Sequence, residues 1–233
     1  MHLGKLWCWI SSVCITVPGF FPASAFAQTG GDAGAFLRLG MGTRALGMGS
    51  AFTGVANDGS SVYWNPAGLG VGVHGRRFTI MSRRMPLDRN QTAMSFSMGL
   101  KPGGGIGFTW IRFGVDNIDA RDLNGQPRGT ISDSENALLF SFSPKIHEKV
   151  SIGVSMKVLL YRLAGQSAKG FGGDIGILVQ PVEPLTLGLM FRDMGTRISW
   201  NTSGFSPQTV RREEWFPRSF TLGAGYRLWE GRI

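Results

Sequence analysis

The sequence predicts an all-β protein, a transmembrane antiparallel β-barrel of which about eight strands are present. Three observations predict this class. From about Arg77 onward, apolar side chains alternate with small or polar ones, which is the period of a β-strand. Glycine (35 of 233 residues) and aromatic residues (11%) are abundant and charged residues (17%) are few, which is typical of a tightly turning β protein and not of a disordered chain. Short turns alternate with longer polar loops, as in outer-membrane barrels.

Residues 1–27 have the features of a signal peptide. A basic start at Lys5 precedes an apolar stretch from Leu6 to Phe21, and Ala25-Phe26-Ala27 is a small-x-small cleavage signature, so we expect cleavage before Gln28. An uncleaved anchor helix is the alternative, but the apolar stretch is short for a span of roughly 20 residues. The segment holds both cysteines of the chain, Cys8 and Cys14. The mature chain is therefore expected to be exported without a disulfide.

Residues 28–75 differ in pattern from the rest of the chain. They are rich in Gly and Ala, their apolar residues are irregularly spaced, and the glycines work against a long helix. We predict short helical turns at about 50–56 and 60–63. The sequence thus divides into a signal peptide (1–27), an N-terminal segment (28–75) and a region of barrel strands (76–233).

The strand region shows repeated two-residue alternation. Val150, Ile152 and Val154 alternate, for example, with Ser151, Gly153 and Ser155. The predicted strands are about 77–86, 91–101, 104–116, 135–146, 149–163, 170–181, 184–194 and 215–229. The joins carry Pro and Gly turn residues, except for two longer polar stretches, 116–135 and 196–214, that we predict to be loops.

The face opposite the apolar side chains distinguishes a membrane barrel from a soluble one. In a soluble sheet that face meets water and should be rich in Lys, Glu, Asp and Thr, whereas here it is mostly Gly, Ser and Thr. Small residues suit an interior crowded by other backbone or by a plug. Segments of about 11 to 15 residues can cross a bilayer, where the sheet must close to satisfy its backbone groups. A secreted soluble β-domain is the alternative. Aromatic residues near strand ends could form interfacial girdles: Trp110, Tyr161, Trp200, Trp215, Tyr226 and Trp229.

Candidate chemistry is sparse. Three charged residues, Lys157, Asp174 and Arg192, are predicted on the inner face of successive strands, where they could pair ionically or contact a solute. His74 and His147 stand alone, so we expect no metal site, no cofactor and no enzyme. The net charge of +9 could suggest nucleic acid, but export and the lack of a basic helix argue against it.

Residues 34–70, GAFLRLGMGTRALGMGSAFTGVANDGSSVYWNPAGLG, resemble the start of PorV/PorQ-type outer-membrane proteins, which are related to the FadL-like outer-membrane transporters. The likeness lies in the glycine-rich lead, the Ala-Phe-x-x-Val-Ala-x-Asp turn and the Tyr-Trp-Asn-Pro-Ala-Gly-Leu run. The stretches GFGGDIGILVQP (170–181), LTLGLMFRDMG (185–195) and FPRSFTLGAGYRL (216–228) are similar to barrel strands of the same group.

The resemblance implies a FadL-like barrel in which residues 28–75 fold inside as a hatch, or plug. The hatch motif that would meet the wall consists of Tyr63, Trp64, Asn65, Pro66, Ala67 and Gly68. Pro66 fixes its own φ and disfavours helix at Asn65, and Gly68 allows close backbone approach. A surface turn with exposed aromatics is the alternative. Because relatives continue past the equivalent of YRLWEGRI, we expect a C-terminally truncated member; a complete eight-strand barrel would be too narrow for a hatch.

The resemblance also implies a function. The first expectation is a PorV-type outer-membrane protein that acts in protein secretion or surface attachment, as in type IX secretion, with secreted cargo proteins as partners. The alternatives are a FadL-like channel for uptake of hydrophobic solutes and a purely structural barrel. In each case the predicted location is the cell outer membrane, with its lipid as a partner.

Overall fold

The computed structural model describes residues 32–71, 73, 75–201 and 211–227. The predicted signal peptide lies outside these residues. One antiparallel sheet makes up most of the described chain, and its strands follow the order of the sequence from β1 to β8. This confirms the predicted all-β antiparallel fold. No helix in the described part of the chain is both long and apolar enough to cross a membrane.

In the described part of the chain the sheet has nine strands. They are β1 (Arg76–Met85), β2 (Arg89–Gly99), β3 (Gly104–Arg121), β4 (Pro127–His147), β5 (Val150–Leu163), β6 (Gln166–Val182), β7 (Leu185–Asn201), β8 (Arg211–Trp215) and β9 (Ser219–Tyr226). The last two act as one interrupted strand, because β8 pairs with the end of β7 and β9 with its beginning. Pro217 lies in the interruption, where its missing N–H breaks no ladder bond. Counted as one, β8 and β9 occupy a single position beside β7, so the sheet has eight strand positions, in agreement with the prediction of about eight strands.

The prediction of a long loop at 116–135 is wrong. Strands β3 and β4 continue as a two-stranded ribbon, and the turn between them spans only residues 122–126. The ribbon is largely exposed on both sides, so neither side needs apolar residues and the alternation that identifies a strand is absent. Similarly, β7 runs on to Asn201, beyond its predicted end at 194.

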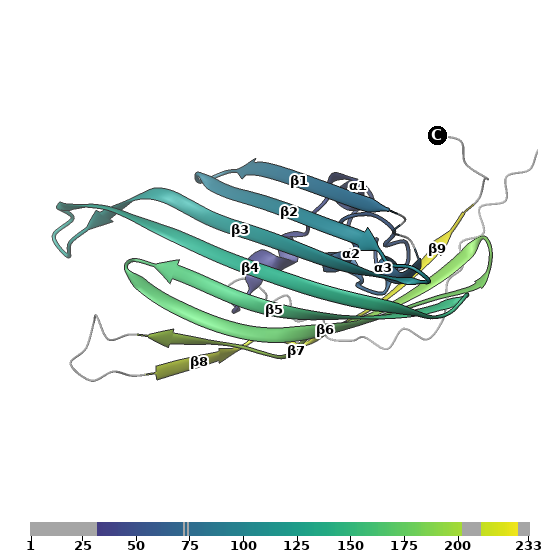
Figure 1. Ribbon diagram of the computed structural model, residues 1–233. Coiled ribbons are helices and arrows are strands. Elements are labelled where there is room, and N and C mark those ends of the chain that lie inside the picture. Colours follow the sequence, from purple (N-terminus) through teal and green to yellow (C-terminus); the bar gives the residue numbers. More distant parts are fainter. Residues whose placement is uncertain (1–31, 72, 74, 202–210, 228–233) are drawn as a thin grey trace, which may run out of the picture.

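The sheet is strongly curved, and the N-terminal segment lies in its concave side (Figure 1). This segment contains four short helices: η1 (Ala35–Leu39), α1 (Thr43–Gly47), α2 (Ser61–Trp64) and α3 (Gly68–Val71). The helical turn predicted at 60–63 matches α2, whereas residues 50–56 form non-helical turns. Within the described residues, β1 does not pair with β8 or β9, so the wall is open at that side, as an incomplete barrel would be.

The two faces of the sheet differ in both size and exposure. Its concave, inner face carries buried small polar residues: Ser95, Ser97, Thr109, Ser141, Ser143, Ser151 and Ser155. Its convex, outer face carries exposed large apolar residues, which we term the apolar belt: Phe78, Ile80, Phe96, Ile106, Phe140, Phe142, Val154, Met156, Leu160, Phe171, Leu187, Phe220 and Leu222. Ser97 is 0% exposed and its neighbour Phe96 is 38% exposed, which is the reverse of a soluble sheet.

The predicted aromatic girdles are only partly present. Tyr161 and Trp200 face inward, pack edge-on with ring centroids 6.2 Å apart, and so cannot form a girdle. Tyr161 also packs against Phe36 of the N-terminal segment. Trp215 and Tyr226 are exposed, and Trp229 lies outside the described residues. Alternation already places Tyr161 on the inner face, because it lies four positions after Lys157 on the same strand, and a girdle residue must lie on the outer face.

Candidate functional site

Asn65 attaches the N-terminal segment to the inner face of the sheet. Its side chain is fully buried, and Nδ2 donates to the carbonyl oxygen of Thr53 at 2.9 Å and to that of Ile177, on β6, at 3.2 Å. Its Oδ1 accepts from the backbone N–H of Ala67 at 3.1 Å. One amide therefore joins two parts of the segment to the wall, and removing it would take this partner from the buried carbonyl of Thr53 and the buried N–H of Ala67.

Glycine and serine on the wall make room for this turn. A Cβ at Gly153 would collide with the backbone of Pro66 and Ala67, and a Cβ at Gly176 would collide with the side chain of Asn65. Ser143 donates to the carbonyl oxygen of Ala67 at 3.3 Å. The small residues of the inner face are thus the surface on which the segment packs.

The same close approach continues along the segment. A Cβ at Gly68 would collide with the carbonyl oxygen of Ala56, within the segment itself. A Cβ at Gly54 would lie 2.8 Å from the carbonyl carbon of Gly223 on β9. On β3, a Cβ at Gly105 would collide with the backbone of Leu69. The segment therefore contacts strands from one side of the sheet to the other.

Tyr63 and Trp64 hold the segment together internally. The Tyr63 hydroxyl donates to the carbonyl oxygen of Leu37, and Trp64 Nε1 donates to that of Met41 at 2.8 Å. The two rings meet edge-on with centroids 4.9 Å apart. Both side chains are buried, which contradicts the alternative of a surface turn with exposed aromatics.

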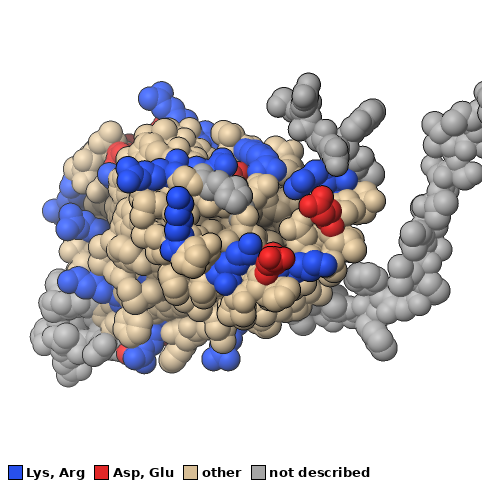
Figure 2. Space-filling model, turned by 45° about the vertical axis from the view of Figure 1, so that its right-hand side comes forward, with Lys and Arg blue, Asp and Glu red and all other residues tan. Residues whose placement is uncertain are grey.

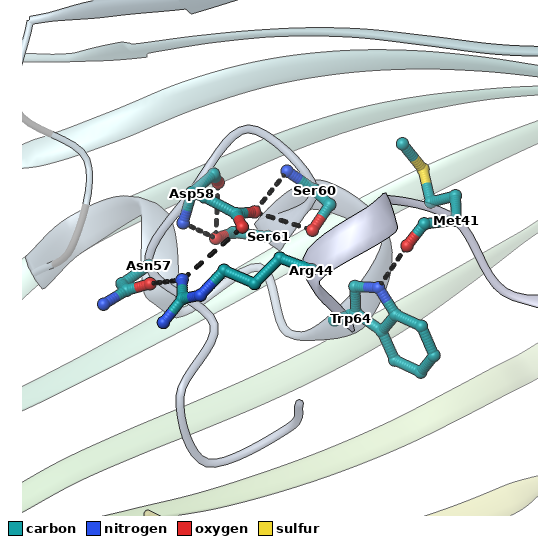
Figure 3. Close-up of polar contacts among 7 residues, drawn as sticks. All are labelled: Met41, Arg44, Asn57, Asp58, Ser60, Ser61 and Trp64. Atoms are coloured by element: carbon teal, nitrogen blue, oxygen red, sulfur yellow. Dashed lines mark hydrogen bonds and ion pairs between the residues drawn. The ribbon is translucent and has the colours of Figure 1, made fainter. Parts of the chain in front are cut away.

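The loop that leads into α2 is fixed by its own polar contacts (Figure 3). Asp58 Oδ1 accepts from the N–H and the hydroxyl of Ser60, at 2.8 and 2.6 Å. Ser61 donates its hydroxyl to the carbonyl oxygen of Asp58 at 2.7 Å. Arg44 contacts Asp58 at 3.6 Å and also bonds to Asn57. These contacts orient the turn that precedes Asn65.

A buried charge cluster lies beside the segment on the inner face. Lys157 on β5 is 3% exposed, and its Nζ is 2.8 Å from Asp174 Oδ1 on β6. It also pairs with Asp193 on β7, whose backbone N–H donates to Asp174 at 2.8 Å. One cation is thus shared by two carboxylates, which is the kind of pairing that buried charges require.

Arg192, the third predicted charge, does not join this cluster. Its guanidinium lies over the ring of Tyr63, 4.6 Å from the centroid, and 5.6 Å from that of Trp64. It also donates to the carbonyl oxygen of Trp64 at 3.4 Å. Arg192 therefore contacts the hatch motif directly through cation–π and hydrogen-bond contacts.

Asp193 was missed in the sequence because alternation would place it on the outer face. The structure has a bulge there: Asp193 and Gly195 have φ of 60° and 67°, and the β6–β7 register shifts around Gly173. The bulge turns Asp193 inward, toward Lys157. The only local signal was the Asp-Met-Gly run, whose polar and glycine residues tolerate positive φ.

Two cavities lie between the N-terminal segment and the sheet. The larger, of about 330 Å³, is lined by apolar residues such as Met48, Val55 and Leu178 and by the polar residues Arg44 and Gln180. The smaller, of about 40 Å³, lies at the charge cluster. Among the residues that the structure describes, no group of His, Cys, Asp and Glu is placed to hold a metal ion.

Comparisons with known proteins give little further identification. No protein-family profile matches the chain, and no curated protein matches it. Among solved structures, the TodX deltaS2S3 mutant monoaromatic hydrocarbon channel is similar, with 14% sequence identity and a TM-score of 0.46. The alignment covers 73% of this chain and 62% of that channel, so the chain spans less than two thirds of its length. A likeness this weak supports no inference about function, and the resemblance of residues 34–70 to PorV/PorQ-type proteins stays a prediction.

Proposed function

We propose that the protein is an outer-membrane barrel protein whose N-terminal segment serves as a hatch. The observation that carries this proposal is the reversal of the two faces. The large apolar side chains of the belt are exposed, and the small polar side chains of the inner face are buried beneath the segment. Exposing such a belt to water is unfavourable, whereas contact with hydrocarbon is favourable. The belt is therefore the surface that lipid would cover.

Passage of hydrophobic small molecules is the activity that the geometry supports best. The cavity of about 330 Å³ is large enough for a small organic solute, and it lies where the hatch meets β6, β7 and β9. Its lining combines apolar side chains with Asn57 and Arg227, which suits a solute that has an apolar body and a polar end. Two further polar residues of the lining, Arg44 and Gln180, can hydrogen-bond to the polar end of that solute and so orient it.

The role in protein secretion or surface attachment is a second candidate. It is supported by the hatch motif and its surroundings in residues 34–70, which resemble PorV/PorQ-type proteins. A deletion strain distinguishes the two candidates. Loss of growth on hydrophobic compounds with normal export supports passage, and retention of cargo proteins inside the cell with normal growth supports secretion.

The membrane proposal is tested by folding. The protein should fold only with detergent or lipid and should migrate differently on gels before and after heating. A monodisperse preparation without detergent would contradict it.

The passage proposal is tested by filling the cavity. Thr186 lines the cavity, and its neighbour Leu187 is an exposed residue of the belt. In lipid vesicles, Thr186→Trp should reduce uptake of a small aromatic solute at least about tenfold, because the indole occupies the cavity. The matched control Leu187→Trp should leave uptake unchanged. Equal uptake by both variants would contradict passage through this cavity.

A further inference from the structure

Three basic residues lie on the outer face just beyond the apolar belt. Arg112 (β3), Arg162 (β5) and Lys169 (β6) are all exposed, and we term them the basic collar. Alternation places them on the outer face: Arg162 follows the belt residue Leu160 by two positions, and Lys169 precedes Phe171 by two. They lie on the side of the belt where β3 and β4 extend as a ribbon, opposite the short β4–β5 turn.

The charges of the collar are not neutralised by the described part of the chain. None of the three side chains makes an ion pair or hydrogen bond with another described residue. By contrast, Arg197 on the next strand, β7, is 3.7 Å from Glu213. Unpaired cations beside an apolar surface attract anions strongly, because the local dielectric constant is lower than that of water.

The three charges of the collar favour a ligand with more than one anionic group. Arg162 is directly opposite Ser134 on β4, and Arg112 is opposite Asn136 on the same strand. Arg112 and Arg162 are thus two strands apart, which is about 10 Å. Together with Lys169 they carry three positive charges, and one phosphodiester group, with a single negative charge, neutralises only one of them. Asn136 and Ser134 lie between them and supply further polar groups.

We propose that the basic collar binds a lipid that carries more than one phosphate group, with its acyl chains lying along the apolar belt. This inference rests on the proposed membrane location. Phosphate groups suit arginine, which can donate two parallel hydrogen bonds. Leu160 and Phe171, exposed by 38% and 62%, lie next to the collar and supply apolar contact that free phosphate could not use. In the usual layout of such barrels, the long-loop side faces outward, so the lipid belongs to the outer leaflet.

The opposite end of the protein offers a matched control. Figure 2, turned so that this end comes forward, shows many more Lys and Arg than Asp and Glu. Arg76, Lys101 and Lys145 are exposed there and make no ion pair with a described residue. They carry the same charge as the collar but lie at the other side of the belt.

The test measures lipid retained by the protein in an uncharged detergent, using native mass spectrometry. The probes are lipid A with two phosphates, phosphatidylglycerol with one, and inorganic pyrophosphate without acyl chains. The wild-type protein should retain lipid A most strongly. The variant Arg112→Gln/Arg162→Gln/Lys169→Gln should bind it about a hundredfold more weakly, since each cation contributes about fivefold. The control Arg76→Gln/Lys101→Gln/Lys145→Gln should bind it as the wild type does.

Three outcomes would overturn the proposal. The two triple variants could lose lipid A binding equally, the wild-type protein could retain phosphatidylglycerol as strongly as lipid A, or it could bind pyrophosphate as strongly as lipid A. Each is distinguishable from failure of the membrane proposal, because folding in detergent and heat-modifiable mobility are measured on the same samples. Retained heat-modifiable mobility in the collar variant shows that it is folded.

Discussion

The inner and outer faces of the same sheet are built from the same alternating sequence but meet different surroundings. The side chains of the inner face are small and polar, and the N-terminal segment covers them so closely that several positions admit only glycine. The side chains of the outer face are large and apolar, and most of them contact no other described element. In this sheet, therefore, the size of the side chains identifies the buried face, and their hydropathy does not.

The largest effect is expected from enlarging a residue of the inner face. Gly153→Val should destabilise the protein by about 4 kcal/mol or more, because the new side chain would collide with the backbone of Pro66 and Ala67. Urea unfolding in detergent measures the change. The control Ala224→Val adds a similar volume at an exposed position, and we expect less than about 0.5 kcal/mol there. Equal losses would mean that the two faces are packed alike.

The buried charge cluster gives the next largest effect. Lys157→Met leaves Asp174 and Asp193 buried without their cation, which should cost about 3 to 5 kcal/mol. The triple variant Lys157→Met/Asp174→Asn/Asp193→Asn removes every charge and should recover much of that stability. If the triple variant unfolds as readily as the single one, loss of packing and not unpaired charge causes the effect.

Attachment of the hatch is tested at Asn65. Asn65→Ala removes the hydrogen bonds to Thr53, Ile177 and Ala67 and should cost about 2 to 3 kcal/mol, since the Thr53 carbonyl and the Ala67 N–H stay buried. Limited proteolysis should then cut within residues 32–73 more quickly. Asn124→Ala, in the exposed β3–β4 turn, is the control and should leave digestion unchanged. Unchanged digestion of the Asn65 variant would remove the docking role of this side chain.

The smallest effect is expected at Asp133, on β4 beyond the basic collar. Burial raises the pKa of Asp133 above the ordinary value of 3.8. The unfolded state therefore loses its proton first as the pH rises past 3.8, and the folded state is disfavoured at higher pH. Asp133→Asn should stabilise the protein at pH 7, by less than about 0.5 kcal/mol because the group is partly exposed, and should have no such effect at pH 3. An equal effect at both pH values would exclude titration as its cause.

Much of the site could be predicted from local sequence. Asn65-Pro66-Ala67 indicated a rigid turn, and alternation placed Lys157 and Asp174 on one face of neighbouring strands. The partners of these residues could not be predicted, since the carbonyl of Ile177 and the rings beneath Arg192 come from distant parts of the chain. Arg192 is separated from Lys157 and Asp174 because the rings of the hatch motif pack over Arg192, and this packing is not visible in the local sequence.

The sequence by itself determined the strand class, the approximate number of strands and the division into one large and one small face, because alternation is a local property of the backbone. The tertiary structure alone decided which side chains meet beneath the N-terminal segment and that a bulge in β7 turns Asp193 toward Lys157. It also decided that Tyr161 and Trp200 pack inside. These outcomes depend on register and curvature, which are set by contacts between residues far apart in the chain.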